Sequence, residues 1–315
     1  MASQPFAGVL VPVLTPFAVS GAPDSGRFVA FCRWLLDQGA DGLAIFGTTS
    51  EANSMSAGER MELLERLLAA GIPAAKLMPG AGACSMTEAA TLMRHAVSHG
   101  VGGVLMLPPF YYKGMSDDGI FAFISGVIDK VGSHALRLFL YHIPPMAVIG
   151  FSLDLVGRLI KAYPDTVVGL KDSSGDWNNT AALLERFPGF AVFPGSEVFL
   201  LDGLRNGAVG CITATGNVNV PGIRKVYENW RTPEADRLQA EITLVRKTIQ
   251  AHPMVPALKR IVAHFHYDPD WASVRPPMVP LSEPQSAKLI GDLKRIGFVL
   301  GDRRRLADRR QQAFV

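Results

Sequence analysis

The sequence has few cysteines and little net charge, and both shortages exclude classes of protein. Cys32, Cys84 and Cys211 are the only cysteines among 315 residues, and no two of them form a C-x-x-C pair. This pattern excludes a disulfide scaffold and a zinc–thiolate site, and it is typical of the reducing cytoplasm. The 31 Lys+Arg against 28 Asp+Glu leave a net charge of +3. That balance argues against a partner that is nucleic acid or a membrane surface.

Long apolar runs and nucleotide-binding motifs are missing as well. The uncharged run 138–153 contains the Pro144-Pro145 pair and is shorter than the roughly 20 apolar residues of a membrane span. No charged region precedes the first apolar stretch, so we expect no signal peptide. Neither G-x-G-x-x-G nor G-x-x-x-x-G-K-[ST] occurs, which leaves no phosphate-binding loop of these types. The basic cluster at 303–310 is interpreted as a solvated tail.

What the sequence does contain is a repeating unit. Gly39, Gly100 and Gly207 each end an amphipathic stretch, and each is soon followed by a short apolar run. Glycine often ends helices because it adopts the left-handed conformation, and an unbroken apolar run is typical of a strand buried on both faces. The spacing fits a βα unit of about 30 to 35 residues. Eight strands are predicted in this way, at 9–16, 43–47, 77–82, 104–108, 138–142, 167–171, 191–195 and 211–215.

Eight strands alternating with helices predict a (β/α)₈ TIM barrel, an α/β fold. The alternation stops after Trp230, where helices are expected at 234–249, 255–266 and 286–296. We therefore expect a catalytic barrel over residues 1–230 and a C-terminal helical extension over 231–315.

Lys171 is the most unusual residue at the predicted strand ends, which is where barrels of this type carry their active sites. It closes the apolar strand 167–171. Burying an ammonium group is unfavourable unless the group is paired or neutralised. Lys171 is therefore either an ion-pair partner of Asp172 or an amine held neutral as a nucleophile.

Two further strand ends carry hydroxyl groups. Tyr141, near the end of strand 138–142, either packs in the core or moves protons to and from an adduct on Lys171. Thr48 and Thr49 follow Gly47 at the end of strand 43–47. Their hydroxyls and the loop N–H groups suit a carboxylate, although such residues also cap helices.

Together these motifs resemble the dihydrodipicolinate synthase / N-acetylneuraminate lyase superfamily of class I, Schiff-base lyases. The resemblance covers residues 6–230. It rests on G-T-T-S-E at 47–51, Y-H-I-P at 141–144 and G-L-K-D-S-S-G-D at 169–176, with further matches at 79–82, 87–89, 195–197 and 210–217.

The resemblance implies a role for each matched residue. Lys171 would form an imine with pyruvate or another 2-oxo acid, Tyr141 and Thr48 would relay protons, and Tyr112 would reach into a neighbouring subunit's site. The implied substrate-binding residues are Gly47, Thr48, Thr49, Ser173, Gly195, Glu197 and Ile212. The family usually forms tetramers built from dimers, which implies a homo-oligomer (dimer or tetramer). No metal or other cofactor is expected, because a protonated imine is itself an electron sink.

One departure from the family pattern bears on the second substrate. Met146 stands where dihydrodipicolinate synthases place an arginine, and no arginine occurs between Arg137 and Arg158. A thioether cannot pair with a carboxylate, whereas a hydrogen bond to a charged group contributes about 1.5–3 kcal/mol. We therefore expect poor use of aspartate semialdehyde, and an aldehyde or sugar acid with an uncharged or sugar-like chain near Met146 and Val148.

The leading hypothesis is a class I aldolase or dehydratase acting on a 2-oxo acid. Three alternatives remain open: 4-hydroxy-tetrahydrodipicolinate synthase, which Met146 disfavours, a non-catalytic 2-oxo acid sensor, and a metal-dependent class II aldolase. The histidines suggest no rival site. His95 and His99 lie four residues apart, but we expect no carboxylate beside them and interpret them as a solvent-facing pair. His142 adjoins Tyr141 and so faces the other side of the strand.

Overall fold

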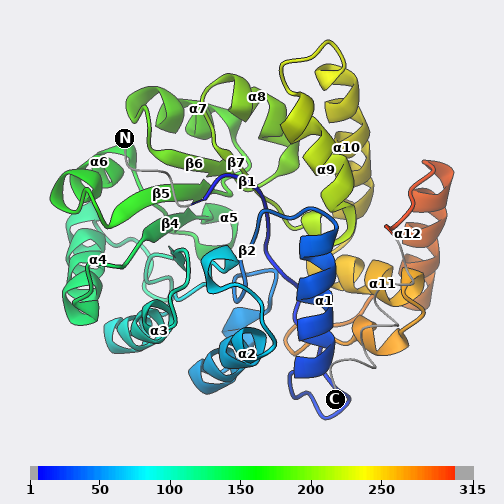
Figure 1. Ribbon diagram of the computed structural model, residues 1–315, viewed down its shortest axis with the longest axis horizontal. Helices are drawn as coiled ribbons and strands as arrows, with labels where there is room; N and C mark the ends of the chain where they lie inside the picture. The colour runs from blue at the N-terminus through cyan, green and yellow to red at the C-terminus, as the bar shows by residue number, and fades with distance from the viewer. Residues whose placement is uncertain (1–5, 302–315) are drawn as a thin grey trace.

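In a computed structural model, which describes residues 6–301, a ring of parallel strands is surrounded by helices (Figure 1). The basic cluster at 303–310 lies outside the described residues. The strands are β1 (Gly8–Val11), β2 (Gly42–Leu43), β3 (Val104–Met106), β4 (Leu138–His142), β5 (Val167–Asp172), β6 (Ala191–Pro194) and β7 (Gly210–Ile212).

The strands pair side by side around the ring. One sheet has the order β2-β1-β7 and the other β3-β4-β5-β6. Two parallel bridges, Leu43 with Leu77 and Gly80 with Leu105, connect β2 to β3. On the other side, the N–H of Val209 donates to the carbonyl of Val192 at 3.2 Å, which connects β6 to the start of β7. The predicted (β/α)₈ barrel is confirmed.

The segment expected as a third strand, 77–82, forms no regular strand and pairs only through those two bridges. Two glycines explain the irregular course. A Cβ atom on Gly80 would lie 2.2 Å from the carbonyl oxygen of Phe46, and one on Gly82 would lie 2.8 Å from Leu107. Glycine in a strand marks such close backbone approaches and weakens the strand.

Most helices start where the sequence supplies a capping side chain. Ser56 and Glu59 form a capping box at the start of α2, and Ser116, Ser152 and Asp176 cap later helices with their side-chain oxygens. Such caps satisfy N–H groups that have no partner within the helix. The helices around the barrel are α1 (Ser25–Asp37), α2 (Ala57–Ala69), α3 (Met86–Ser98), α4 (Asp117–Val131), α6 (Leu153–Ala162), α7 (Trp177–Arg186), α8 (Leu200–Arg205) and α9 (Gly216–Asn229), with the short α5 (Pro144–Ala147) after β4 and the 3₁₀ turn η3 (Glu197–Phe199) after β6.

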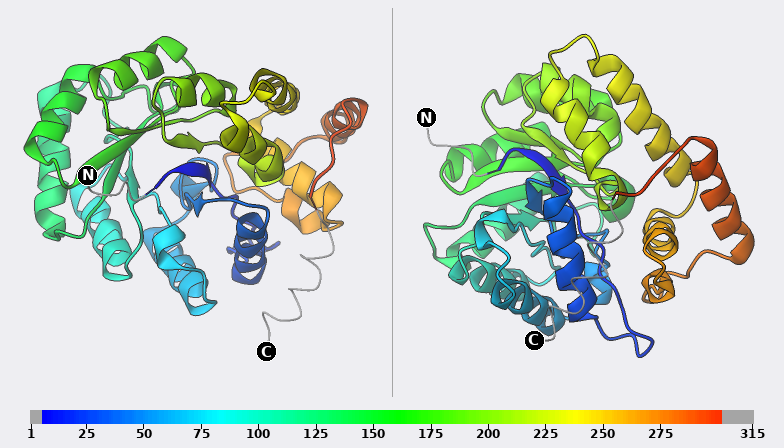
Figure 2. Two further views of the ribbon diagram at one scale, coloured as in Figure 1. Left: turned by 45° about the horizontal axis from the view of Figure 1, so that its top comes forward. Right: turned by 45° about the vertical axis from the view of Figure 1, so that its right-hand side comes forward.

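Three further helices lie to one side of the barrel, in the yellow to red part of the chain (Figure 2). They are α10 (Ala235–Gln250), α11 (Met254–Phe265) and α12 (Glu283–Arg295). We propose to divide the chain at residue 230, because the alternation of strands and helices ends with α9. Among the described helices, none combines the length and apolar character that crossing a bilayer requires.

Candidate active site

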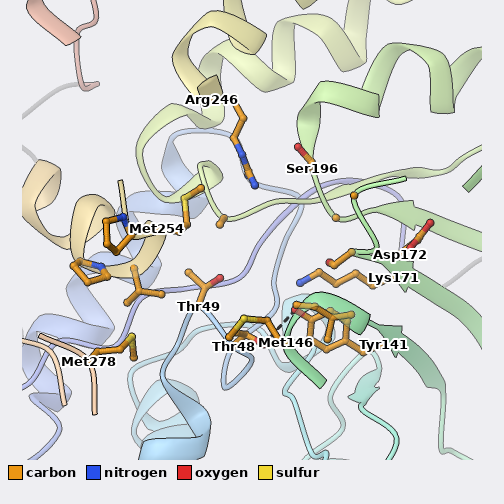
Figure 3. A pocket seen from close by; sticks show the side chains of 18 of the residues that line it. Thr48, Thr49, Tyr141, Met146, Lys171, Asp172, Ser196, Arg246, Met254 and Met278 are labelled. Carbon is orange, nitrogen blue, oxygen red and sulfur yellow. Dashed lines mark hydrogen bonds between the residues drawn. The ribbon is translucent and has the colours of Figure 1, made fainter. Parts of the chain in front are cut away.

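A cavity of about 600 Å³ lies at the C-terminal ends of the strands and continues between the barrel and the C-terminal helices (Figure 3). Residues at the ends of five strands (β2, β4, β5, β6 and β7) and residues of the C-terminal extension line it. The lining residues are Thr48, Thr49, Tyr141, Ile143, Met146, Lys171, Asp172, Ser173, Gly175, Gly195, Ser196, Phe199, Ala214, Arg246, Pro253, Met254, Val255, Pro256, Pro277, Met278 and Val279.

Lys171 and Tyr141 occupy paired positions on the neighbouring strands β5 and β4. Both side chains are almost fully buried, with 4% of each residue exposed. The Nζ atom of Lys171 lies 4.2 Å from the centre of the Tyr141 ring. Parallel pairing at the same register therefore brings the two groups together at the floor of the cavity.

Asp172 does not pair with Lys171. Its carboxylate accepts hydrogen bonds from the backbone N–H of Ser174 at 2.9 Å, the Asn179 amide at 3.0 Å and the Thr180 hydroxyl at 2.6 Å. Adjacent strand residues face opposite sides, and in Figure 3 Asp172 points away from the amine. No ion pair of Lys171 occurs within residues 6–301, so the structure does not support the ion-pair interpretation of this lysine.

The loop after β2 supplies hydroxyl groups next to Tyr141. The Thr48 hydroxyl lies 3.3 Å from the Tyr141 hydroxyl, and Thr49 lines the cavity beside it. Ser50 points away, is fully buried and donates to the carbonyl of Val13 at 2.5 Å. Ser50 therefore anchors the loop to the chain after β1.

The other predicted site residues divide into two groups. Ser173 and Gly195 line the cavity, and a Cβ on Gly195 would lie 2.0 Å from the Ser173 hydroxyl, so only glycine lets the two segments meet. Gly47, Glu197, Ile212 and Tyr112 are not lining residues. Ile212 is buried inside the barrel with the ring of Phe139 and other apolar side chains.

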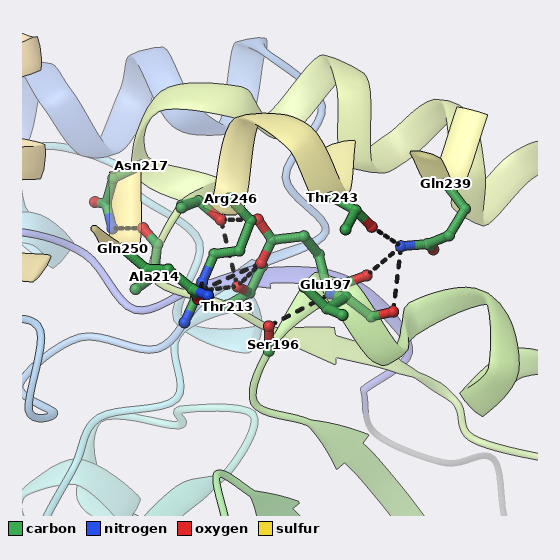
Figure 4. Close-up of polar contacts among 11 residues, drawn as sticks. Ser196, Glu197, Thr213, Ala214, Asn217, Gln239, Thr243, Arg246 and Gln250 are labelled. Atoms are coloured by element: carbon green, nitrogen blue, oxygen red, sulfur yellow. Dashed lines mark hydrogen bonds and ion pairs between the residues drawn. The ribbon is translucent and has the colours of Figure 1, made fainter. Parts of the chain in front are cut away.

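Glu197 is fully buried behind the cavity wall, and Tyr112 is 68% exposed on the surface. The Glu197 carboxylate accepts hydrogen bonds from the hydroxyls of Thr213 and Thr215 and pairs with Arg246 at 3.3 Å (Figure 4). The sequence-based role of Glu197 as a substrate contact thus has no support in this geometry, because the carboxylate is covered by its own partners.

The loop after β4 brings Met146 to the cavity, whereas Val148 is exposed and does not line it. His142 lies on the far side of β4, as expected from strand geometry. Its Nδ1 accepts a hydrogen bond from the backbone N–H of Phe151 at 2.9 Å. Burial lowers the pKa of His142, and the charge of Asp172 opposes part of that shift. The lowered pKa leaves the ring neutral at neutral pH, so Nδ1 can accept this hydrogen bond.

Sequence reasoning missed the wall that the extension contributes. Arg246 on α10, Met254 on α11 and Met278 beyond it all line the cavity. The sequence marks none of them, because Arg246 is one of several cations on an amphipathic helix and the two methionines resemble ordinary packing residues. Their contribution depends on how the extension packs on the barrel.

The histidine pair on α3 also differs from expectation. A carboxylate does accompany it, since Glu65 Oε1 lies 2.9 Å from His95 Nε2. Ligand-type atoms of Glu65, His95 and His99 lie within 4.8 Å of one another. The expectation that no carboxylate accompanies this pair is therefore wrong.

Comparison with other proteins gives a consistent result. Residues 5–296 match the Dihydrodipicolinate synthetase family. The chain is 32% identical over 291 residues to an Uncharacterized DapA-like lyase of Chloroflexus aurantiacus, which covers 92% of this chain and 96% of that protein. It is 28% identical over 290 residues to a 4-hydroxy-tetrahydrodipicolinate synthase of Rhizobium meliloti, covering 90% and 96%. The crystal structure of dihydrodipicolinate synthase from Agrobacterium tumefaciens matches with a TM-score of 0.87 and 32% identity, covering 92% and 99%.

Proposed function

The chain belongs to the dihydrodipicolinate synthetase family of lyases, and we propose that it acts on pyruvate or another 2-oxo acid through an imine with Lys171. The family match confirms the resemblance that the strand-end motifs indicated. The observation that carries the proposal is the buried Lys171 amine, which faces a cavity, has the Tyr141 ring beside it, and has no carboxylate partner within residues 6–301.

In the proposed reaction the lysine amine attacks the ketone carbon of the 2-oxo acid and gives a carbinolamine. Loss of water then forms the imine. When protonated, the imine withdraws electrons from the neighbouring carbon, so that carbon can lose a proton to give an enamine, or form or break a bond to an aldehyde carbon. The electrons of the enamine can also expel a hydroxyl group from the next carbon along the chain, and this hydroxyl leaves as water after protonation. The last two outcomes correspond to an aldolase and a dehydratase.

The residues around Lys171 fit the remaining steps. The hydroxyl oxygens of Tyr141 and Thr48 lie 3.3 Å apart, and this pair of hydroxyls suits proton transfer to and from the carbinolamine oxygen. Thr48 and Thr49 offer hydroxyls from the loop after β2, which lines the same cavity as Lys171, and there they would bind the 2-oxo acid carboxylate. Ser173 and Gly195 complete the floor of this part of the site.

A second candidate is 4-hydroxy-tetrahydrodipicolinate synthase activity, which is the name of the Rhizobium meliloti relative. Met146 disfavours it, because that loop provides no cation for a second carboxylate. Arg246 places a guanidinium in the same cavity, however, so a coupled assay with aspartate semialdehyde is informative. Turnover at ordinary synthase rates would favour this candidate over the aldolase or dehydratase.

The decisive experiment is reductive trapping. The protein is incubated with pyruvate and borohydride, and the modified peptide is located by mass spectrometry. We expect a single adduct on Lys171 that is absent from Lys171→Ala and present in Lys161→Ala, since Lys161 lies on the exposed face of α6. An adduct on another lysine, or none, would contradict the imine. If pyruvate is trapped but no aldehyde or sugar acid in a screen is turned over, the result would favour a 2-oxo acid sensor. If a chelator abolishes turnover, the result would favour a metal-dependent aldolase.

We also propose a homo-oligomer, a dimer or tetramer, and a cytoplasmic location. The first is supported by the exposed aromatic side chains around Tyr112. The second is supported by three free cysteines, of which Cys84 is exposed, since exposed thiols persist in reducing compartments.

A further inference from the structure

The wall that the C-terminal extension contributes to the cavity is apolar except for the cation Arg246. Its apolar side chains are those of Pro253, Met254, Val255, Pro256, Pro277, Met278 and Val279, and Phe199 and Ser196 lie on the barrel side of the same cavity. In Figure 3 the guanidinium of Arg246 and the amine of Lys171 point into the same space from different sides.

Arg246 is held in place from behind. Its Nη1 lies 3.3 Å from the Glu197 carboxylate and donates to the Thr213 hydroxyl at 3.2 Å, while its Nε donates to Gln250 at 3.1 Å. The Glu197 side chain is 0% exposed and that of Arg246 is 14% exposed. A long side chain that is fixed on one edge loses little further freedom when its other edge binds a ligand.

The opposite edge of the guanidinium is available. Within residues 6–301, Nη2 of Arg246 has no hydrogen-bond or ion-pair partner. The Glu197 carboxylate cannot satisfy that edge, because it is already engaged with two threonine hydroxyls and Nη1 (Figure 4). The backbone of Glu197 is also tied to α10, through the Gln239 amide at 2.9 Å. The donor edge therefore faces the cavity on a rigid support.

From this arrangement we infer that Arg246 binds a second anionic group of the substrate, and that the preferred substrate is a 2-oxo acid whose apolar chain ends in a carboxylate. The inference rests on the proposed imine at Lys171 and extends it to the other end of the chain. Apolar walls offer few hydrogen-bond partners to the hydroxyls of a sugar chain. In a mostly hydrophobic pocket, the few polar groups determine which ligand binds. The proposed substrate thus has a charged end and an apolar middle, whereas Met146 considered alone favours an uncharged or sugar-like chain.

The test compares matched pairs of 2-oxo acids in the trapping experiment. 2-Oxoglutarate is paired with 2-oxopentanoate and 2-oxoadipate with 2-oxohexanoate, so that each pair has equal chain length and differs in the terminal carboxylate. The measured quantity is the concentration that gives half-maximal borohydride trapping on Lys171. We expect at least one diacid to be trapped at about 10-fold lower concentration than its neutral partner, as one charged hydrogen bond provides.

Arg246→Gln is expected to abolish this preference, and Arg246→Lys to retain part of it. Since Arg246→Gln leaves Glu197 buried without its cation, the double variant Glu197→Gln/Arg246→Gln is measured too, and it is expected to lack the preference as well. Arg237→Gln is the matched control, because Arg237 lies on the same helix, is 60% exposed and pairs with Glu234 and Glu241. It is expected to keep the wild-type ratio.

The outcomes separate this inference from the proposed function. Trapping of pyruvate with equal trapping of each matched pair, or a preference that survives in both Arg246→Gln and the double variant, would overturn the role of Arg246 and leave the imine intact. Failure to trap pyruvate itself on Lys171 would instead overturn the proposed function, and the inference with it.

Discussion

Tyr141 combines a packing surface with a hydroxyl that faces the cavity, and the two can be separated by one substitution. Its ring lies against the Lys171 amine, and its hydroxyl lies 3.3 Å from that of Thr48. Tyr141→Phe keeps the ring and removes the proton carrier. Because general acid–base groups contribute about 100- to 10,000-fold to a rate, we expect the rate of imine formation with pyruvate, followed by timed borohydride quenching, to fall within that range.

Tyr163→Phe serves as the control for this substitution, because Tyr163 directly follows α6 and does not line the cavity. Its rate is expected to match that of the wild type. A Tyr141→Phe rate equal to that of Tyr163→Phe would show that the phenol takes no part in proton transfer and that Tyr141 only packs.

Individual residues differ in how far the sequence reveals them. Lys171 is conspicuous because a lysine in an apolar strand is costly to bury. Glu197 lies in a matching motif, yet the position of its side chain depends on Thr213, Thr215 and Arg246, which are distant in sequence. Arg246 carries no local signal at all. Its orientation results from packing between α10 and the end of β6, which a one-dimensional pattern does not record.

At the scale of elements, the C-terminal extension is tied to the loop that carries Thr48 and Thr49. Lys259 on α11 forms an ion pair with Glu51 in which both side chains are 0% exposed. Lys259 also donates to the carbonyl of Ser273 at 2.7 Å, and the N–H of Arg275 donates to Glu51 at 2.8 Å. The extension is therefore part of the active-site structure, whereas the sequence indicated only helices packed on a barrel.

We expect the two halves of this buried pair to be strongly coupled. Lys259→Met leaves the Glu51 carboxylate buried without a cation, and Glu51→Gln leaves the ammonium without its anion. Each should lower the free energy of unfolding by about 3–5 kcal/mol, because an unpaired buried charge is strongly destabilising. The double variant, which buries no charge here, should lose much less than the sum. Urea denaturation of the four proteins measures this coupling.

A control variant and the pH dependence of stability also test whether Lys259 and Glu51 form a buried, coupled pair. Lys288→Met removes one partner of the surface pair Lys288–Asp292, in which Lys288 is 67% exposed, and it should change stability by less than about 1 kcal/mol.

Burial lowers the pKa of Lys259 from 10.5 to about 8 despite the opposing effect of Glu51. Since the unfolded chain then binds more protons between these values, stability from this group should rise from pH 8 to pH 10.5. If the free energy of unfolding depended on pH in the same way for the wild type and for Lys259→Met, the prediction that Lys259 titrates in this range would be contradicted.

The sequence pattern predicts the regular strands of the barrel more accurately than it predicts the irregular segment 77–82. Apolar runs such as Leu138–His142 are buried along their whole length, so pattern and structure agree. At 77–82 the pattern is equally apolar, but Gly80 and Gly82 allow neighbouring backbone to approach within distances that no side chain would permit. The irregularity arises from contacts with Phe46 and Leu107, which the local pattern does not contain.

At the scale of the whole molecule, an exposed group of large side chains follows β3. Tyr111, Tyr112 and Met115 are 74%, 68% and 47% exposed, and the two tyrosine rings contact edge to face at 5.3 Å. Neither tyrosine lines the cavity of its own chain. Exposed clusters of this kind are typical of protein–protein interfaces, which is consistent with the prediction that Tyr112 serves the site of a neighbouring subunit.

That prediction can be tested by complementation between two inactive variants. In a two-fold dimer with shared sites, a chain carrying Lys171→Ala still provides Tyr112, and a chain carrying Tyr112→Phe still provides Lys171. Each mixed dimer then contains one complete site. Random mixing by co-expression should therefore restore about a quarter of the wild-type number of sites, because about half of the dimers are mixed. Turnover of the mixture is compared with that of each variant alone.

A mixture of Lys171→Ala with Tyr141→Phe provides the control, since Lys171 and Tyr141 belong to the same cavity in one chain. Every site in its mixed dimers lacks one of the two residues, so no activity should be recovered beyond that of the Tyr141→Phe chains. Recovery in the Tyr112 mixture alone requires a residue that crosses between chains. Equal behaviour of the two mixtures would place Tyr112 in the site of its own subunit or outside the chemistry altogether, and the exposed tyrosines would then have no part in completing the cavity.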